Sequence, residues 1–70
     1  MQYHSLLFED AIKDYDDALK YDPGNAETFY NRGNVYLHQE SFDRAHNDFD
    51  RAINLDDSNS KFYHAKGLVF

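Results

Sequence analysis

The chain has 70 residues, no cysteine and a formal net charge of −6. This length allows one small domain. The lack of cysteine excludes a disulfide framework and thiolate zinc sites, and it fits a cytoplasmic or other reducing intracellular compartment. The acidic balance argues against binding to nucleic acid and to anionic membranes, because both require basic residues that contact phosphates. No apolar run approaches the roughly 18 residues that a membrane span needs.

Four helical segments are predicted in chain order. Apolar residues recur at i, i+3, i+4 and i+7, and no segment alternates between polar and apolar residues as a strand would. Hydrophobic residues make up 41% of the chain, which is enough for a folded core. The segments cover about residues 6–21, 26–39, 42–55 and 60–70.

Short polar stretches separate these segments and supply helix caps. Pro23 begins the only strong turn dipeptide, and Asn25 follows as a suitable N-cap for the second segment. Asn59 holds the same place before the last segment. Ser41 is expected to cap the third segment, with Asp43 favourable in its first turn.

The sequence repeats itself at an interval of 34 positions, most clearly at Gly33 and Gly67. A fixed period of this length indicates a repeat array, and such arrays bind partners more often than they catalyse reactions. A glycine inside a helix costs about 1 kcal/mol relative to alanine, so its recurrence indicates close helix approach. The same interval separates Phe8 from Phe42, Ala11 from Ala45, Tyr15 from Phe49, Ala18 from Ala52, Asp22 from Asp56, and Phe29 from Tyr63.

This pattern resembles the tetratricopeptide repeat (TPR), a unit of 34 residues that forms two antiparallel helices, A and B. One complete unit carries the family's positions at Phe29, Gly33, Tyr36, Phe42, Ala45, Phe49 and Ala52. It departs at Arg32, where the family has leucine, and at Asp57, where the family has proline; the earlier copy keeps that proline as Pro23. The resemblance implies an all-α fold of antiparallel helix-turn-helix repeats, a TPR-like α-solenoid with four helices in B-A-B-A order.

Residues 1–70 are expected to form a single TPR-like domain with three parts. Residues 1–25 would supply the B helix of a partial repeat, residues 26–59 one complete repeat, and residues 60–70 the A helix of another partial repeat. Small residues are expected where helices approach closely: Ala11, Ala18, Gly33, Ala45, Ala52 and Gly67. Aromatic residues are expected to fill the space between the helices: Phe8, Phe29, Tyr36, Phe42, Phe49 and Tyr63.

The resemblance also implies a groove, lined by A helices, that binds a peptide segment. The groove residues that it implies are Tyr30, Asn31, Asn34, His38, Lys61 and His64, with Glu27 nearby. Asn31 and Lys61 match two positions of a carboxylate clamp with which some family members hold the tails of heat-shock chaperones, whereas Ala65 stands where that clamp has arginine. The expected partner is a protein or peptide, with an acidic or carboxy-terminal end as one option. Asn31 and Asn34 could instead serve only neighbouring groups of the fold.

A structural role in self-assembly is the alternative function. The two ends of the chain are apolar, and they are nearly continuous in repeat register, which predicts a head-to-tail homo-oligomer. The residues expected to associate are Leu6, Leu7, Phe8, Leu68 and Phe70. A fragment of a longer array and a monomer with frayed ends are the other interpretations.

No catalytic site, metal site or cofactor is predicted, so the chain is not expected to be an enzyme. The histidines do not show the spacing of metal ligands, and no glycine-rich phosphate loop is present. These histidines are His4, His38, His46 and His64. The acidic turn at residues 56–60 lacks the central glycine and the distal glutamate of a calcium loop, so helix capping is the better explanation.

Overall fold

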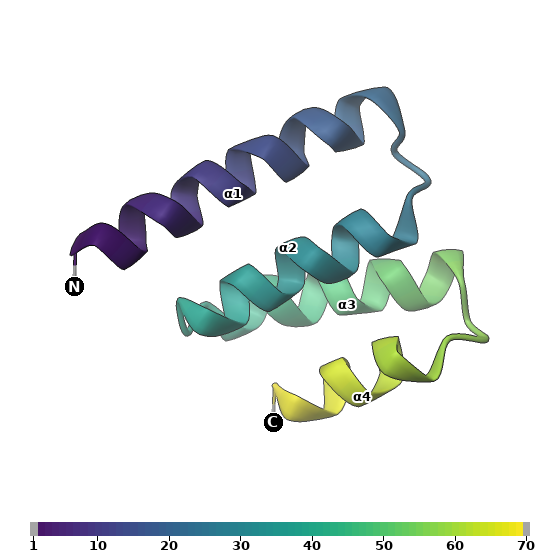
Figure 1. Ribbon diagram of the computed structural model, residues 1–70. Coiled ribbons are helices and arrows are strands. Elements are labelled where there is room, and N and C mark those ends of the chain that lie inside the picture. The colour runs from purple at the N-terminus through teal and green to yellow at the C-terminus, as the bar shows by residue number, and fades with distance from the viewer. Residues whose placement is uncertain (1, 70) are drawn as a thin grey trace.

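The computed structural model describes residues 2–69, with side chains for residues 7–69. Within this range the chain forms four helices and no strand (Figure 1). They are α1 (Gln2–Tyr21), α2 (Ala26–His38), α3 (Phe42–Leu55) and α4 (Ser60–Leu68). Short turns join them, and consecutive helices run in opposite directions (Figure 1). The predicted all-α solenoid with helices in B-A-B-A order is confirmed.

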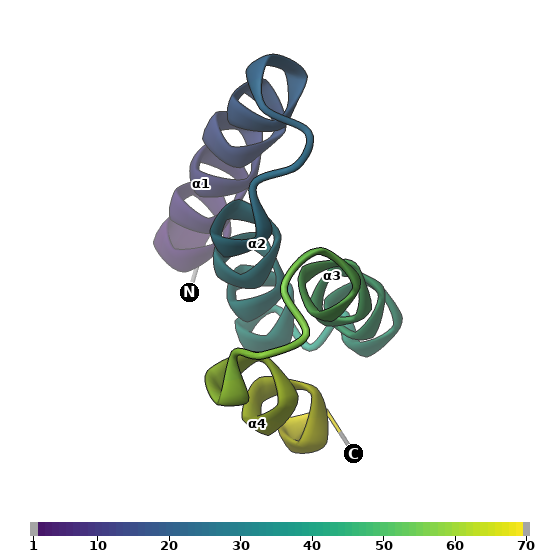
Figure 2. The ribbon, with the colours of Figure 1, turned by 90° about the vertical axis from the view of Figure 1, so that its right-hand side faces the viewer.

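Helix α2 lies at the centre of the arrangement. It packs against α1, α3 and α4, and α4 also contacts α3. Seen nearly end-on, α3 lies on one side of α2 (Figure 2). The opposite side of α2, between α1 and α4, has no described helix over it (Figure 2). This arrangement leaves one face of α2 available for other contacts.

Two of the three predicted helix caps form as expected. The side chain of Asn25 accepts a hydrogen bond from the backbone N–H of Thr28 at 3.2 Å, and that of Asn59 accepts one from the N–H of Lys61 at 3.1 Å. Ser41 occupies the N-cap position of α3, but its side chain makes no capping hydrogen bond. The predicted capping hydrogen bond of the Ser41 side chain is therefore wrong, although α3 begins at the predicted residue.

The turn between α2 and α3 contains a residue in a left-handed conformation. Glu40 has a φ of 61°, the only positive φ among the described residues other than glycine. Its N–H bonds to the carbonyl oxygen of Leu37 at 3.0 Å, and the N–H of Ser41 bonds to that of Tyr36 at 2.8 Å. This pair of bonds is a Schellman motif, in which glycine usually takes the left-handed position.

The core consists of two clusters between α2, α3 and α4. Phe29, Ala52 and Phe62 form one, and Ala45, Phe49 and Ala65 form the other. The half-buried ring of Tyr30 packs against both clusters. Gly33 is also buried, as expected from its recurrence in the repeat.

Several expected core residues lie at the surface instead. Tyr63 is 50% exposed and Phe42 is 47% exposed, whereas Phe62, which was not expected in the core, is only 1% exposed. Phe29 is the repeat equivalent of Tyr63 and belongs to the α2–α3 core, but no described helix covers the corresponding side of α4. The side of α4 that faces α3 and α2 carries Phe62 instead.

The two small residues that differ most from expectation are Ala18 and Gly67. Ala18 is exposed because α1 contacts only α2 among the described helices. At Gly67 an added Cβ would meet no atom within 4 Å. Close helix approach therefore occurs at Gly33 but not at Gly67.

Candidate functional site

The face of α2 that lies away from α3 carries two asparagines. Gly33 faces α3, and Asn31 lies about 160° from it around the helix, at about 100° per residue. Asn34 is displaced from Gly33 by about 100° toward the same open side. Both side chains are half-buried. Within residues 7–69, neither side-chain amide makes a hydrogen bond.

Lys61 lies beside this face, and two residues of α2 hold it there. Its Nζ is 3.0 Å from Oε2 of Glu27, the residue 34 positions earlier in the chain. Its Nζ is also 5.0 Å from the centre of the Tyr30 ring. The ion pair joins equivalent positions of two A helices, so it connects one repeat to the next along the array. Both of its side chains are about half exposed, at 47% and 50%.

Tyr30 belongs to the core as much as to the groove. Its ring centre lies 5.2 Å from that of Phe62 and 6.1 Å from that of Phe49. Lys61 therefore lies over one face of a half-buried ring that also packs against two phenylalanines.

The two histidines expected in the groove are placed differently. The ring of His38 stacks on Phe8 of α1, with ring centres 5.9 Å apart and an interplanar angle of 9°. His64 is exposed on α4 and makes no ion pair or ring contact with another described residue. Ala65, at the position of the clamp arginine, is buried and packs in the core. The structure thus brings Lys61, Tyr30 and Glu27 together and leaves His64 apart.

Comparison with known families settles what kind of repeat this is. A family model described as TPR repeat matches residues 8–40, and one described as Tetratricopeptide repeat matches residues 26–59. The chain belongs to the tetratricopeptide repeat family. A comparison with curated proteins found no match. TPR repeats are in general non-catalytic modules for protein–protein interaction.

Arg32, where the TPR family has leucine, joins three helices of this TPR chain. Its Nε and Nη2 each donate to a carboxylate oxygen of Asp48 on α3 at 2.8 Å. Its Nη1 donates to Asp16 on α1 at 2.6 Å. The bond to Asp48, followed by the bond to Asp16, holds the pKa of the Arg32 guanidinium well above its usual value, against the opposing effect of burial. Arg32 therefore remains charged throughout the normal pH range.

The repeat carries part of this ion-pair network forward. Lys66 is the equivalent of Arg32 in the next TPR unit and Asp50 is the equivalent of Asp16, and Lys66 Nζ lies 2.7 Å from Asp50 Oδ1. In the sequence, Arg32 stands out only as a departure from the TPR signature. The recurrence of a base and an acid at the same 34-residue interval was the signal that could have revealed the network.

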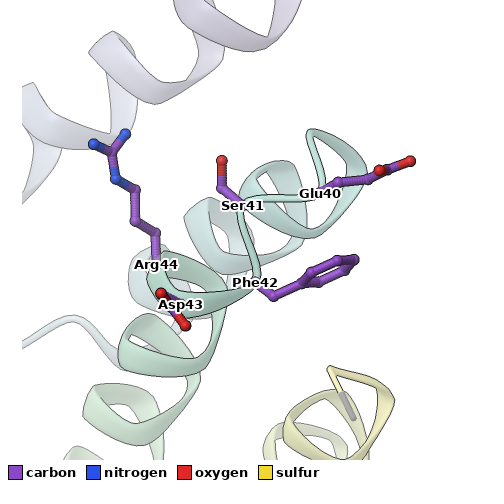
Figure 3. A pocket seen from close by; sticks show the side chains of 5 residues that line it. All are labelled: Glu40, Ser41, Phe42, Asp43 and Arg44. Atoms are coloured by element: carbon purple, nitrogen blue, oxygen red, sulfur yellow. The ribbon is translucent and has the colours of Figure 1, made fainter.

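A hollow lies at the turn between α2 and α3, and the side chains that line it do not point toward a common centre. Its side chains point in different directions, and that of Arg44 extends toward α1 (Figure 3). The hollow holds about 510 Å³ and is lined by Glu40, Ser41, Phe42, Asp43 and Arg44. Nothing in this geometry resembles a catalytic centre.

The described residues of this TPR chain offer neither a metal site nor a membrane-spanning helix. No group of three or more His, Cys, Asp or Glu side chains among them could hold a metal ion. No helix in this part of the chain is both long enough and apolar enough to cross a membrane.

Proposed function

We propose that this TPR segment binds a peptide along α2 and α4, in a groove lined by Asn31, Asn34 and Lys61. The observation that carries the proposal is the pair of half-buried asparagine amides on the open face of α2, with no side-chain hydrogen bond inside residues 7–69. An amide side chain both donates and accepts hydrogen bonds, so it suits the main chain of an extended peptide. The division into repeat parts at residues 1–25, 26–59 and 60–70 belongs to this proposal.

The charge beside the amides favours a ligand with a carboxylate. An exposed ion pair such as Lys61–Glu27 contributes about 0–1 kcal/mol, so a ligand carboxylate can replace Glu27 at little cost. Ala65 supplies no second cation at this place. A single lysine is consistent with modest affinity for an acidic or carboxy-terminal end.

A titration followed by NMR tests this proposal. A short peptide with a free terminal carboxylate is added to the isotopically labelled chain, and the same peptide with an amidated end serves as its control. Saturable shifts are expected for the side-chain amides of Asn31 and Asn34 and for Lys61, with weaker binding of the amidated peptide. If the shifts leave α2 untouched, the groove assignment is wrong.

Two variants separate the amide contact from the charge contact. Asn34→Ala is expected to weaken both peptides equally, whereas Lys61→Gln is expected to remove the preference for the free carboxylate. Lys20→Gln is the matched control, because Lys20 forms a similar exposed ion pair with Asp17 on α1, at 3.8 Å. A Lys61→Gln chain that still prefers the free carboxylate contradicts the role of Lys61.

A structural role in self-assembly is the second candidate function, and one observation favours it. α3 covers Gly33, but the equivalent face at Gly67 is open, and Tyr63 and Leu68 beside it are 50% and 59% exposed. Helix α1 carries Tyr15 at the repeat position of Phe49. We propose that α1 of a second copy takes the place over Gly67 that α3 takes over Gly33, which would join copies head to tail.

The other residues expected in this association differ in how they are placed. Leu7 is 63% exposed, and Phe8 is half-buried in its stack with His38. The side chain of Leu6 and the whole of Phe70 lie outside the described residues.

A further inference from the structure

Three basic side chains of this acidic protein form no ion pair with any residue in the range 7–69. They are Lys13, Arg44 and Arg51, whereas ion pairs engage Lys20, Arg32, Lys61 and Lys66. The chain has 13 Asp and Glu residues for 7 Lys and Arg, so carboxylate partners are abundant. Basic groups without a partner are therefore not explained by a shortage of acids.

All three of these basic residues line one furrow along α3, with α2 as its floor and with α1 bordering it at the hollow that contains Lys13. The furrow consists of three adjoining hollows, here called the α1–α3 furrow. Lys13 and Arg44 line the first hollow, Arg44 and Arg51 line the second, and Arg51 lines the third. Tyr36 forms part of the floor of the first two, and Phe29 part of the floor of the third.

The α1–α3 furrow lies on the opposite side of α2 from the proposed groove. Arg32 and Tyr36 belong to the furrow, and each is two residues from Asn34, which places them about 160° from it around the helix. Figure 3 shows Arg44 reaching from α3 toward α1 rather than toward α4. A ligand in the furrow would therefore not compete for the groove.

Aromatic rings and the central ion pair hold the arginines in place. The Arg44 guanidinium lies 5.9 Å from the centre of the Tyr36 ring, and that of Arg51 lies 5.8 Å from the centre of the Phe29 ring. Between them, Asp48 and Asp16 compensate the charge of Arg32. A guanidinium over a ring keeps its N–H groups available for anionic oxygens.

The spacing of the two arginines suits an extended chain. Arg44 and Arg51 are seven residues apart on α3, which places them about 10.5 Å apart along the helix axis. A polyproline II segment returns to the same side every three residues and advances about 9.3 Å in doing so. Carboxylates at positions i and i+3 of such a segment can therefore reach both arginines.

We propose that the α1–α3 furrow binds an acidic peptide segment with carboxylates three residues apart. Apolar side chains line the two ends of the furrow, Ile12 at one and Leu55 at the other, and offer contacts for the apolar residues of such a segment. The net charge of −6 works against a long polyanion such as nucleic acid. A short peptide with two or three carboxylates gains the local contacts with much less of that long-range repulsion.

Calorimetric or NMR titration with synthetic peptides tests the proposal. One peptide has glutamates at i and i+3 in a proline-containing background, a second has them at i and i+1, and both are amidated to remove the terminal carboxylate that the groove prefers. The first is expected to bind more tightly and to shift signals of Arg44, Arg51 and Tyr36. The double variant R44Q/R51Q is expected to weaken it about tenfold or more, as for lost charge-assisted hydrogen bonds.

Matched variants decide between this contact and a general charge effect. R44K/R51K retains both charges and is expected to recover part of the affinity, more at low ionic strength than at high. The double variant K20Q/K66Q removes two positive charges elsewhere and is expected to leave binding within about twofold of the unmodified chain, since each of these lysines already pairs with a carboxylate and both are exposed enough to be screened. Equal losses in R44Q/R51Q and K20Q/K66Q, or equal binding of the two peptides, would overturn the proposal. Circular dichroism of each variant checks that the helices remain.

Discussion

Gly33 and Phe49 pack so closely that a Cβ atom on Gly33 would lie 2.6 Å from Cε1 of Phe49. The neighbouring Asp48 Cβ is 3.2 Å from the same point, so α2 and α3 leave no room for a side chain here. Phe49 is fully buried, which limits how far its ring can move. Gly33 is therefore required because α2 and α3 approach closely at this point, and not because its backbone needs a positive φ.

The first prediction is that Gly33→Ala destabilises the protein. The methyl group would force Phe49 from its place, and overpacking of this kind costs about 1–3 kcal/mol. Alanine's helix preference offsets about 1 kcal/mol of this cost, so a net loss of up to about 2 kcal/mol is expected. Chemical denaturation followed by circular dichroism measures the change in the free energy of unfolding. Gly67→Ala is the matched control, because its Cβ meets nothing within 4 Å and alanine favours the helix by up to about 1 kcal/mol. Effects of the same sign at both sites would contradict the packing argument.

A second prediction concerns Arg32, and it runs against the family pattern. Arg32→Leu restores the residue usual in the family, but it leaves the carboxylate of Asp48 buried without its partner, since that side chain is only 4% exposed. Removing one member of a buried pair costs about 3–5 kcal/mol. Thermal unfolding is expected to shift to markedly lower temperature.

The double variant R32L/D48L checks the cause of that loss. Replacing both partners by apolar residues of similar size is often neutral, so the double variant should recover most of the stability. Lys66→Leu removes the exposed pair with Asp50, which is the repeat equivalent of the Arg32–Asp16 pair, and it is expected to change stability by no more than about 1 kcal/mol. If R32L and K66L have equal effects, the burial of Asp48 is not what makes Arg32 matter.

A third prediction follows from the left-handed conformation of Glu40, whose φ is 61°. A residue with a Cβ is strained there by about 1–2 kcal/mol, and glycine is not, although glycine loses more backbone entropy on folding. Glu40→Gly is therefore expected to stabilise the protein by up to about 1 kcal/mol in chemical denaturation. Gln39→Gly, at a φ of −80°, is the control and should destabilise it.

The residues that recur at the 34-residue interval explain why the fold could be predicted and part of the site could not. Gly33, Ala45 and Phe49 occupy signature positions, and their contacts depend only on the helix pair to which they belong. Burial of Tyr63 depends on a further helix that the pattern does not contain, so its exposure could not be inferred from periodicity. The position of Lys61 was implied by family resemblance, but its partner Glu27 follows only from the angle between successive repeats.

The ion pairs show a second limit of the same kind. Arg32 was visible in the sequence as a departure from the family, but charge alone does not say which of the 13 Asp and Glu residues it meets. Asp48 and Asp16 come from different helices, each 16 residues away in the chain, on opposite sides of it. Pairing over such a distance requires the packing of α1, α2 and α3 to be known.

The last prediction addresses self-association through Gly67. If α1 of a second copy seats Tyr15 over Gly67, the weight-average mass of the unmodified chain in solution should rise with concentration. Gly67→Gln should prevent this rise, because a long side chain fills the open face while leaving the monomer, which has nothing within 4 Å of that point, undisturbed. Ser60→Gln lies on the same helix at an exposed position and should associate like the unmodified chain. Multi-angle light scattering over a wide concentration range measures the mass of all three chains. A constant monomer mass for the unmodified chain, or association of Gly67→Gln, would contradict head-to-tail assembly. Neither outcome would bear on the peptide groove proposed on α2.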